Sequence, residues 1–367
     1  MNRSASELSK PEVAAVTDPG EFFKALQQTF RVAEKRSQRD AVDCFYRIGI
    51  ETVWLRFAGP ALLPLVTPAL EHLAAEPCPA PALTVCLWDS ASTDTEPVVP
   101  PWSINDYLTR GEVRGYSDGD FRTSYYPGSG LLSVLNRRSG VGFYWLANAR
   151  QIPRHERAAP LLPILSWWAS ERGCQVVHAA AVGNTDGGVL LAGRGGSGKS
   201  TTALACLNAG MLYAGDDYCM ITTDGSGDQR PHVHSLYNSG KLDAASAKRF
   251  PLVMPALDHG NGFEAEKAIY FLHDSHREKV SAGFPLRAFV LPRVTDLAET
   301  KIKRVAPAAS LLALAPSTIF QLSGAGRRAF ARLNRVVKQI PSYELQLGAD
   351  VSVVVPDMIS RLLSDAQ

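Results

Sequence analysis

The chain has 367 residues, of which 46% are hydrophobic and 20% charged, and a formal net charge of +2 at pH 7. A hydrophobic fraction of this size excludes a disordered chain and is ample for the cores of about two domains of ordinary size. A net charge so close to zero gives no support for nucleic acid or an anionic membrane surface as the main partner.

The first part of the chain is predicted to be a smaller α+β domain over residues 18–150, after a small, polar and disordered segment, 1–17. The stretch DPGEFFKALQQTF has an Asp before a Pro and apolar residues at helical spacing, which predicts a helix. CFYRIGIETVWLRFAG and ALTVCLWD predict strands, PALLPLVTPALEHLAAEP between them predicts a helix, and short strand-like runs follow from 111 to 148. We expect a largely antiparallel sheet that binds or orients the substrate, because we find no catalytic motif here.

The second part, residues 151–367, is predicted to be a nucleotide-binding α/β domain. It opens with a helix at about 156–172, which Gly173 ends. Beyond residue 174 the sequence alternates between strand and helix patterns, as in α/β folds. Near its end, SYELQLGADVSVVV predicts a strand or hairpin, and DMISRLLSDA predicts a terminal helix.

Residues 193–200, GRGGSGKS, match the pattern G-x-x-x-x-G-K-[ST] of a phosphate-binding loop. Glycines let backbone N–H groups turn toward phosphate oxygens, Lys199 brings a positive charge to the β- and γ-phosphates, and the Ser200 hydroxyl can bind Mg²⁺. An apolar strand precedes the loop, and the helix after it presents its positive end to the anion. The predicted cofactors are ATP and Mg²⁺, and the predicted binding residues are Gly193, Arg194, Gly195, Gly196, Ser197, Gly198, Lys199, Ser200 and Thr201.

Two aspartates, Asp216 and Asp217, follow Lys199 by 17 and 18 residues. A helix of about ten residues runs ~15 Å away from the loop, a glycine then reverses the chain, and MLYAG can return as a strand. This path predicts that one carboxylate lies near Mg²⁺ and the other near the γ-phosphate, where it could take a proton from a hydroxyl; a polar turn is the alternative. A tight hairpin at TDG would bring His178 close to the strand that feeds the loop.

Together these residues resemble the HPr kinase/phosphorylase family, whose catalytic domain belongs to the phosphoenolpyruvate carboxykinase-like ATPases. The resemblance rests on His178, GNTDGG, GRGGSGKS, the helix after it and GDD, and it covers residues 176–221. It implies that the catalytic residues are Asp217, His178 and Lys199, and that the metal ligands are Ser200 and Asp216. By this resemblance Asp217 accepts the proton of the substrate hydroxyl and His178 assists.

The chain departs from that family downstream of the aspartates. We find no counterpart of the family's second glutamate metal ligand or of its glycine-rich signature, and the corresponding region reads VHSLYNSGKLD. The reverse, phosphorylase-type reaction is therefore not implied. Tyr237, Asn238 and Lys241 in this region are candidates either for contact with substrate or nucleotide, or for capping a helix.

The phrases ERAAPLLPILSWW, VVHAAAVG, SLYNSGKL and LAPSTIFQLSG resemble a narrower group, the HPr-kinase-like proteins encoded beside lasso-peptide precursors. This resemblance implies a serine kinase that transfers the γ-phosphate of ATP to the C-terminal serine of the precursor. A basic group should then lie near the acceptor, and the candidates are Lys241, Lys267, Arg287 and Arg293. A kinase acting on a folded carrier protein and a non-catalytic nucleotide sensor are the alternatives.

The remaining expectations concern location and partners. The N-terminus lacks the apolar segment of a signal peptide, and no run approaches the ~18 apolar residues of a membrane span. None of the six cysteines has zinc-site spacing, and most lie in apolar runs, which favours buried thiols in a reducing compartment. We expect a cytoplasmic protein that acts on a precursor peptide or small protein, without nucleic acid or membrane partners; a homo-oligomer is compatible with the sequence.

Overall fold

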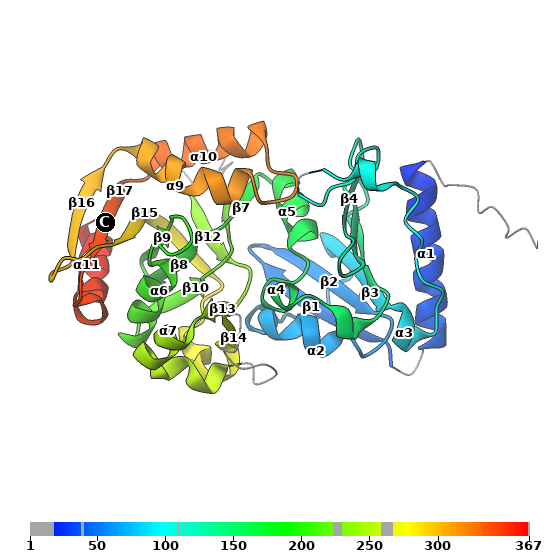
Figure 1. Cartoon of the computed structure of the whole chain (residues 1–367), viewed down its shortest axis with the longest axis horizontal. Coiled ribbons are helices and arrows are strands. Elements are labelled where there is room, and N and C mark those ends of the chain that lie inside the picture. Colours follow the sequence, from blue (N-terminus) through cyan, green and yellow to red (C-terminus); the bar gives the residue numbers. More distant parts are fainter. Residues whose placement is uncertain (1–17, 38–39, 109, 223–229, 258–266, 366–367) are drawn as a thin grey trace, which may run out of the picture.

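The computed structural model of the chain describes residues 18–37, 40–108, 110–222, 230–257 and 267–365. The segment 1–17, predicted to be disordered, lies outside these residues. The described part has a mixed α/β fold whose strands form two large sheets and one two-stranded sheet (Figure 1). Within it, no helix combines the length and the hydropathy needed to cross a lipid bilayer.

The first large sheet is mixed, although the sequence predicts a largely antiparallel one. Its elements are α1 (Pro19–Arg36), β1 (Val42–Ile48), β2 (Glu51–Phe57), β3 (Leu83–Asp89), α3 (Ser90–Thr93), β4 (Phe121–Tyr126), β5 (Leu131–Asn136) and β6 (Val141–Leu146). The strand order is β1-β2-β3-β6-β5-β4, with β3 parallel to both β2 and β6. The long connections before and after β3 allow this parallel pairing, because they return the chain to the same end of the sheet. Aromatic residues of α1 pack on one face of this sheet.

Prolines break up the helix predicted in the segment between β2 and β3. The segment instead forms α2 (Leu63–Val66) and two short 3₁₀ turns, Thr67–Ala69 and Glu71–Leu73. Pro64 and Pro68 each lie in the first turn of a new element. A proline has no N–H to donate and its ring clashes with the preceding turn, so it starts helical turns but does not continue them.

A proline also divides the helix predicted at 156–172. The structure has a 3₁₀ turn (Ala149–Gln151), then α4 (Arg154–Ala158) and α5 (Leu162–Glu171). Pro160 lies between the two helices, and Leu161 adopts a left-handed conformation with φ +61°. Both tryptophans of α5, Trp167 and Trp168, are buried.

The second large sheet contains most of the remaining strands. They are β7 (Cys174–Val177), β8 (Ala180–Asn184), β9 (Gly187–Leu191), β10 (Leu212–Gly215), β11 (Cys219–Thr222), β12 (His232–Ser235), β15 (Gly283–Val294), β16 (Lys301–Val305) and β17 (Ser342–Leu347). The order is β10-β8-β9-β15-β12-β11-β7, and β17 pairs with both β15 and β16. Among these described pairings, the parallel ones are β15 with β9 and β15 with β17. Since β7, β8 and β9 follow one another directly, the predicted alternation of strand and helix is wrong there.

Helices cover both faces of the second sheet, as in a three-layer α/β/α arrangement (Figure 1). The long ones are α6 (Lys199–Asn208), α9 (Pro307–Ile319), α10 (Arg327–Gln339) and α11 (Val351–Asp365). Ala180 and Val182 of β8 pack with α6 and α11, whereas Ala181 between them packs with α9 and α10. This alternation follows from the two-residue repeat of a strand, and a sheet buried on both faces needs apolar residues at both positions.

A smaller unit lies beside the second sheet. It contains β13 (Ser239–Leu242), α7 (Ala244–Arg249), a 3₁₀ stretch (Pro251–Ala256), β14 (Ala268–Phe271), α8 (His273–His276) and a 3₁₀ turn (Arg277–Lys279). Strands β13 and β14 pair in antiparallel register and place Gly240 opposite Tyr270.

The end of the chain shows tertiary packing overriding a local preference. SYELQL forms the predicted strand, β17, but the valine-rich run after it begins helix α11 rather than a hairpin. Val351, Val355, Ile359 and Leu363 recur every four residues and are buried with residues of α6. β-Branched residues favour strands only weakly, and burial of this one-sided stripe outweighs that preference.

The two large sheets share one apolar core. Leu55 of β2, Trp168 of α5, Val176 of β7 and Met220 of β11 belong to the same buried cluster. The chain passes from one sheet to the other through α4 and α5. The division into two domains near residue 150 stays a prediction.

Candidate active site

The predicted phosphate loop connects β9 to α6, which begins at Lys199. Gly196 (φ +77°) and Gly198 (φ +103°) adopt backbone conformations that residues with side chains rarely take. A Cβ at Gly198 would also lie 2.3 Å from a methyl carbon of Leu347, whereas Gly195 and Gly196 face open space. The loop is therefore packed on one side and accessible on the other, the shape in which backbone N–H groups bind phosphate oxygens.

Lys199 is buried at the start of α6 and closes over its own loop. Its ammonium group donates hydrogen bonds to the carbonyls of Gly193 (2.8 Å) and Arg194 (3.3 Å). Burial lowers the pKa of Lys199, and the charges of Asp216 and Asp217 act in the opposite direction. Both carboxylates are thus within electrostatic reach of the loop lysine, as the spacing of the sequence predicts.

The other predicted loop residues differ in exposure. Arg194, Gly195 and Gly196 are exposed, and Gly193 is buried. Ser197, Ser200 and Thr201 are partly buried, the last two in the first turn of α6.

Asp216 is a buried carboxylate directly after β10. Strand β10 pairs with β8 in antiparallel register, which brings the chain back beside the loop. The hydroxyls of Tyr270 (3.1 Å) and Ser200 hydrogen-bond the side chain. Burial raises the pKa of Asp216 to about 7, and the neighbouring charge of Asp217 adds to this rise.

The free oxygen of Asp216 fits a cation. Its Oδ1 is buried and has no hydrogen-bond partner among the described residues. A buried carboxylate oxygen without a donor is unfavourable unless a cation or water satisfies it. Carboxylate and hydroxyl oxygens are the ligands that Mg²⁺ prefers, so Asp216 and Ser200 have the chemistry to hold that ion.

Two buried tyrosines, Tyr270 and Tyr213, support the side chain of Asp216 through hydrogen bonds. The Tyr213 hydroxyl donates to the carbonyl of Ser239 (3.2 Å) and lies 3.4 Å from the Tyr270 hydroxyl. Gly240 makes this possible, because a Cβ there would lie 2.1 Å from the Tyr270 hydroxyl oxygen. The small β13–β14 sheet therefore supports the orientation of the carboxylate, a link that the sequence does not reveal.

Asp217 lies between two basic side chains. Its Oδ2 is 3.1 Å from the ammonium of Lys241, and its Oδ1 is 3.9 Å from Nε2 of His178. About a quarter of each of the three side chains is exposed. A carboxylate that is oriented by neighbours and still reachable from solvent can accept a proton from a bound hydroxyl.

His178 lies at the end of β7, and its ring packs against Tyr218 with centroids 5.3 Å apart. Its backbone N–H donates to the Thr318 hydroxyl (3.3 Å). Burial, followed by the charge of Lys199, lowers the pKa of His178 to about 4, although Asp217 opposes this shift. The imidazole is therefore neutral near pH 7. The β8–β9 hairpin forms as predicted and pairs Asn184 with Gly187.

Two of the polar residues singled out in SLYNSGKL have structural partners. The Tyr237 hydroxyl donates to the carbonyl of Pro160, and the Asn238 amide donates to the carbonyl of Pro68 and accepts from the N–H of Leu272. Both residues are buried, and they tie the small sheet to the first half of the chain. The side-chain oxygen of Asn238 accepts hydrogen bonds from the N–H groups of Leu272 and His273 at the start of α8, so Asn238 caps that helix, which is one of the two predicted alternatives.

The four basic candidates for binding an acceptor carboxylate lie in different places. Lys241 belongs to the site through its ion pair with Asp217. Lys267 is exposed, and its charge acts on Lys199. Arg287 binds the Asp186 carbonyl at the β8–β9 turn, the end of β9 opposite the loop, and is therefore wrong as a candidate. Arg293 is exposed near the end of β15.

Sequence reasoning missed Glu156, a fully buried glutamate in α4. Its Oε2 accepts a hydrogen bond from the Tyr144 hydroxyl (3.1 Å). Burial raises the pKa of Glu156 to about 7, and the charge of Lys241 acts against this rise. In the sequence it stands in the polar stretch PRHERAAP, where nothing distinguishes it from a surface charge.

Comparison with known proteins adds little to this geometry. No family model and no curated protein matches the chain. Among solved structures, the HPr(Ser) kinase/phosphatase from Coxiella burnetii matches with 12% identity, over 52% of this chain and 95% of that one, at a TM-score of 0.27. Identity and overlap at this level establish neither a shared fold nor a shared activity. The resemblance to the HPr-kinase-like family and to its lasso-peptide subgroup stays a prediction.

Proposed function

We propose that this protein is a kinase that transfers the γ-phosphate of ATP to a serine hydroxyl of a peptide. The observation that carries the proposal is the setting of Asp217. It is a reachable carboxylate between His178 and Lys241, one residue after a buried carboxylate and within electrostatic reach of the loop lysine. Phosphoryl transfer to an alcohol needs such a group beside the phosphates, because the attacking hydroxyl must lose its proton.

Each residue of the site has its own role in the proposed transfer. The loop backbone and Lys199 bind the β- and γ-phosphates, and Ser200 with Asp216 would hold Mg²⁺, which neutralises phosphate charge when bound. Asp217 accepts the proton of the serine hydroxyl as its oxygen bonds to the γ-phosphorus. The bond from that phosphorus to the β-phosphate oxygen breaks, and ADP leaves with the electron pair. Neutral His178 can take the proton on from Asp217.

We further propose that the accepting serine is the C-terminal residue of a precursor peptide of the lasso-peptide type. The sequence phrases that resemble that group motivate the choice. Lys241 supports it chemically, because a terminal carboxylate next to the accepting hydroxyl would meet a positive charge 3.1 Å from Asp217.

Mass spectrometry of synthetic peptides tests this proposal. Peptides that end in serine are incubated with the pure protein and Mg·ATP, beside versions with a terminal alanine and with a terminal carboxamide. We expect phosphate on the terminal serine, none on the alanine peptide, and strongly reduced transfer to the carboxamide. Asp217→Asn should bind nucleotide but lose transfer, while Asp186→Asn, an exposed aspartate at the β8–β9 turn, should behave as wild type.

The other outcomes identify the alternatives. Phosphate on an internal serine of folded HPr, with the peptides ignored, would keep the kinase and reject the terminal-serine acceptor. Tight nucleotide binding without turnover would indicate a sensor and reject the kinase. Wild-type transfer by Lys199→Ala would show that the phosphate loop is not the active site.

A further inference from the structure

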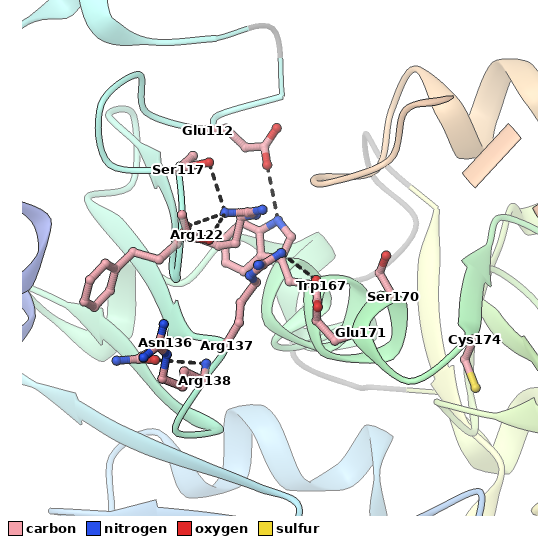
Figure 2. A network of polar contacts seen from close by, with 12 residues as sticks. Glu112, Ser117, Arg122, Asn136, Arg137, Arg138, Trp167, Ser170, Glu171 and Cys174 are labelled. Carbon is pink, nitrogen blue, oxygen red and sulfur yellow. Dashed lines mark hydrogen bonds and ion pairs between the residues drawn. The ribbon is translucent and has the colours of Figure 1, made fainter. Parts of the chain in front are cut away.

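A cavity of 430 Å³ lies at the junction of the two large sheets and shares no lining residue with the candidate active site. Figure 2 shows part of its wall, with Arg122 and Arg137 from the first sheet facing α5. We call it the arginine pocket, and its charged or aromatic lining residues are Arg122, Arg137, Trp167, Glu171, Arg327 and Arg328. Arg122 lies on β4, Arg137 in the β5–β6 turn, and the last two arginines open α10.

The charges in this pocket do not balance. Four guanidinium groups line it, and Glu171, its single lining carboxylate, is already bound to Arg137 at 2.6 Å. Arg327 and Arg328 are exposed and form no ion pair within the described ranges of the chain. Burial, and then the charge of Arg137, lowers the pKa of Arg122, and the charges of Glu112, Glu171 and Asp118 act against this shift. A crowded set of like charges in a cavity is stabilised by an anion.

Arg122 already donates to the backbone carbonyls of Ser117, Gly119 and Phe121, but one donor of the neighbouring Arg137 is unused. The Nε of Arg137 is buried and has no acceptor among the residues that the structure describes. Helix α10 begins at Arg327, its N-cap residue Gly326 has no side chain to cap it, and its first turn contains no acidic residue, so its positive end also faces this region uncompensated. A buried donor without an acceptor is unfavourable, which points to a ligand that accepts hydrogen bonds.

The walls of the pocket are held in place by contacts that do not involve these donors. Glu112 accepts hydrogen bonds from Trp167 Nε1 (3.2 Å) and from the N–H of Gly324 (3.0 Å), so its charge is directed to the wall (Figure 2). Arg332, one turn after the start of α10, donates to the carbonyl of Ser170 (2.7 Å) at the end of α5. The arginines are therefore presented by elements that are already fastened together, and little order has to be gained on binding.

We infer that the arginine pocket binds an anion with at least two negative charges, a phosphate or clustered carboxylates. Guanidinium groups bind such oxyanions with paired, charge-assisted hydrogen bonds. The volume of the pocket falls in the range of small-ligand sites. A phosphorylated small molecule and an acidic peptide segment both carry this chemistry. The inference does not depend on the proposed kinase activity, because the two sites share no residue.

Calorimetric titration of the full chain tests the inference and separates the two sources. The probes are glycerol 3-phosphate and hexaglutamate, with hexalysine as the control for charge. The test variant is Arg327→Gln with Arg328→Gln, and the matched control is Arg36→Gln with Arg361→Gln, two exposed arginines that do not line the pocket. Anion binding at the phosphate loop would not respond to the test variant, so it cannot imitate the expected result.

We expect at least one anionic probe to bind, with an affinity that falls as salt is added. Each lost guanidinium should weaken binding about tenfold, and the control pair should leave it unchanged. Binding of hexaglutamate alone identifies an acidic peptide as the ligand class, and binding of glycerol 3-phosphate alone identifies a phosphorylated small molecule. If neither probe binds, or if the control pair weakens binding as much as the test pair, the inference is wrong.

Discussion

A methyl group added at Gly240 would lie 2.1 Å from the hydroxyl oxygen of Tyr270 and 2.3 Å from the ring carbon that carries it. Tyr270 is fully buried, so the ring has no free space in which to move aside. The same hydroxyl donates the hydrogen bond that orients Asp216. We therefore predict that Gly240→Ala destabilises the fold and releases this carboxylate from its tyrosine.

The expected magnitude comes from two effects. Overpacking a filled core destabilises by about 1–3 kcal/mol. Separating Tyr270 from Asp216 leaves a buried polar group unpaired, which adds about 1–3 kcal/mol. The free energy of unfolding should therefore fall by about 2–6 kcal/mol, a large part of the total for an ordinary domain.

A double-mutant cycle separates this contact from a general effect of the substitution. Tyr270→Ala removes the obstacle, so adding Gly240→Ala to it should change the free energy of unfolding by less than about 1 kcal/mol. Urea denaturation of the four proteins at one pH measures each value. The reasoning is refuted if Gly240→Ala has wild-type stability, or if it is equally destabilising with and without the tyrosine ring.

Three further predictions concern the charged groups. Since burial raises the pKa of Glu156 from 4.5 to about 7, the folded state keeps a proton that the unfolded chain releases, and stability falls as pH rises through this interval. Asp216 contributes to the same slope, so Glu156→Gln should reduce the slope in urea denaturation and add up to about 3 kcal/mol to the free energy of unfolding above pH 7; an unchanged slope would contradict this prediction. Since burial lowers the pKa of His178 to about 4, the NMR signals of its imidazole should not titrate near pH 6.5, the ordinary value for histidine. A titration midpoint near pH 6.5 would contradict this prediction. Lys241→Met should slow transfer by about tenfold or more at unchanged nucleotide affinity, with partial rescue by Lys241→Arg; a parallel loss of affinity would place Lys241 in the nucleotide site.

The parts of the candidate site that could be predicted from the sequence are those encoded over short distances. The turn after Asn184, the glycine loop, helix α6 and the return strand before Asp216 all form where their local patterns place them. Each depends on residues a few positions apart, such as the glycines that permit positive φ in the loop. The same local reasoning was wrong where prolines divided a predicted helix and where packing against α6 made the run after β17 helical.

Only the tertiary structure decided which distant groups meet. Lys241 pairs with Asp217 and Tyr270 with Asp216, although long stretches of chain separate the partners. Glu156 is nearer in sequence to Tyr144, and only the fold buries the two together. The four arginines of the arginine pocket come from three separate segments, Arg122, Arg137 and the start of α10. Neither residue type nor spacing encodes such pairs, because burial and charge pairing depend on which faces of the sheets and helices pack together. That packing is set by the apolar core of the whole chain, and it determines which of many ordinary charged residues become part of a site.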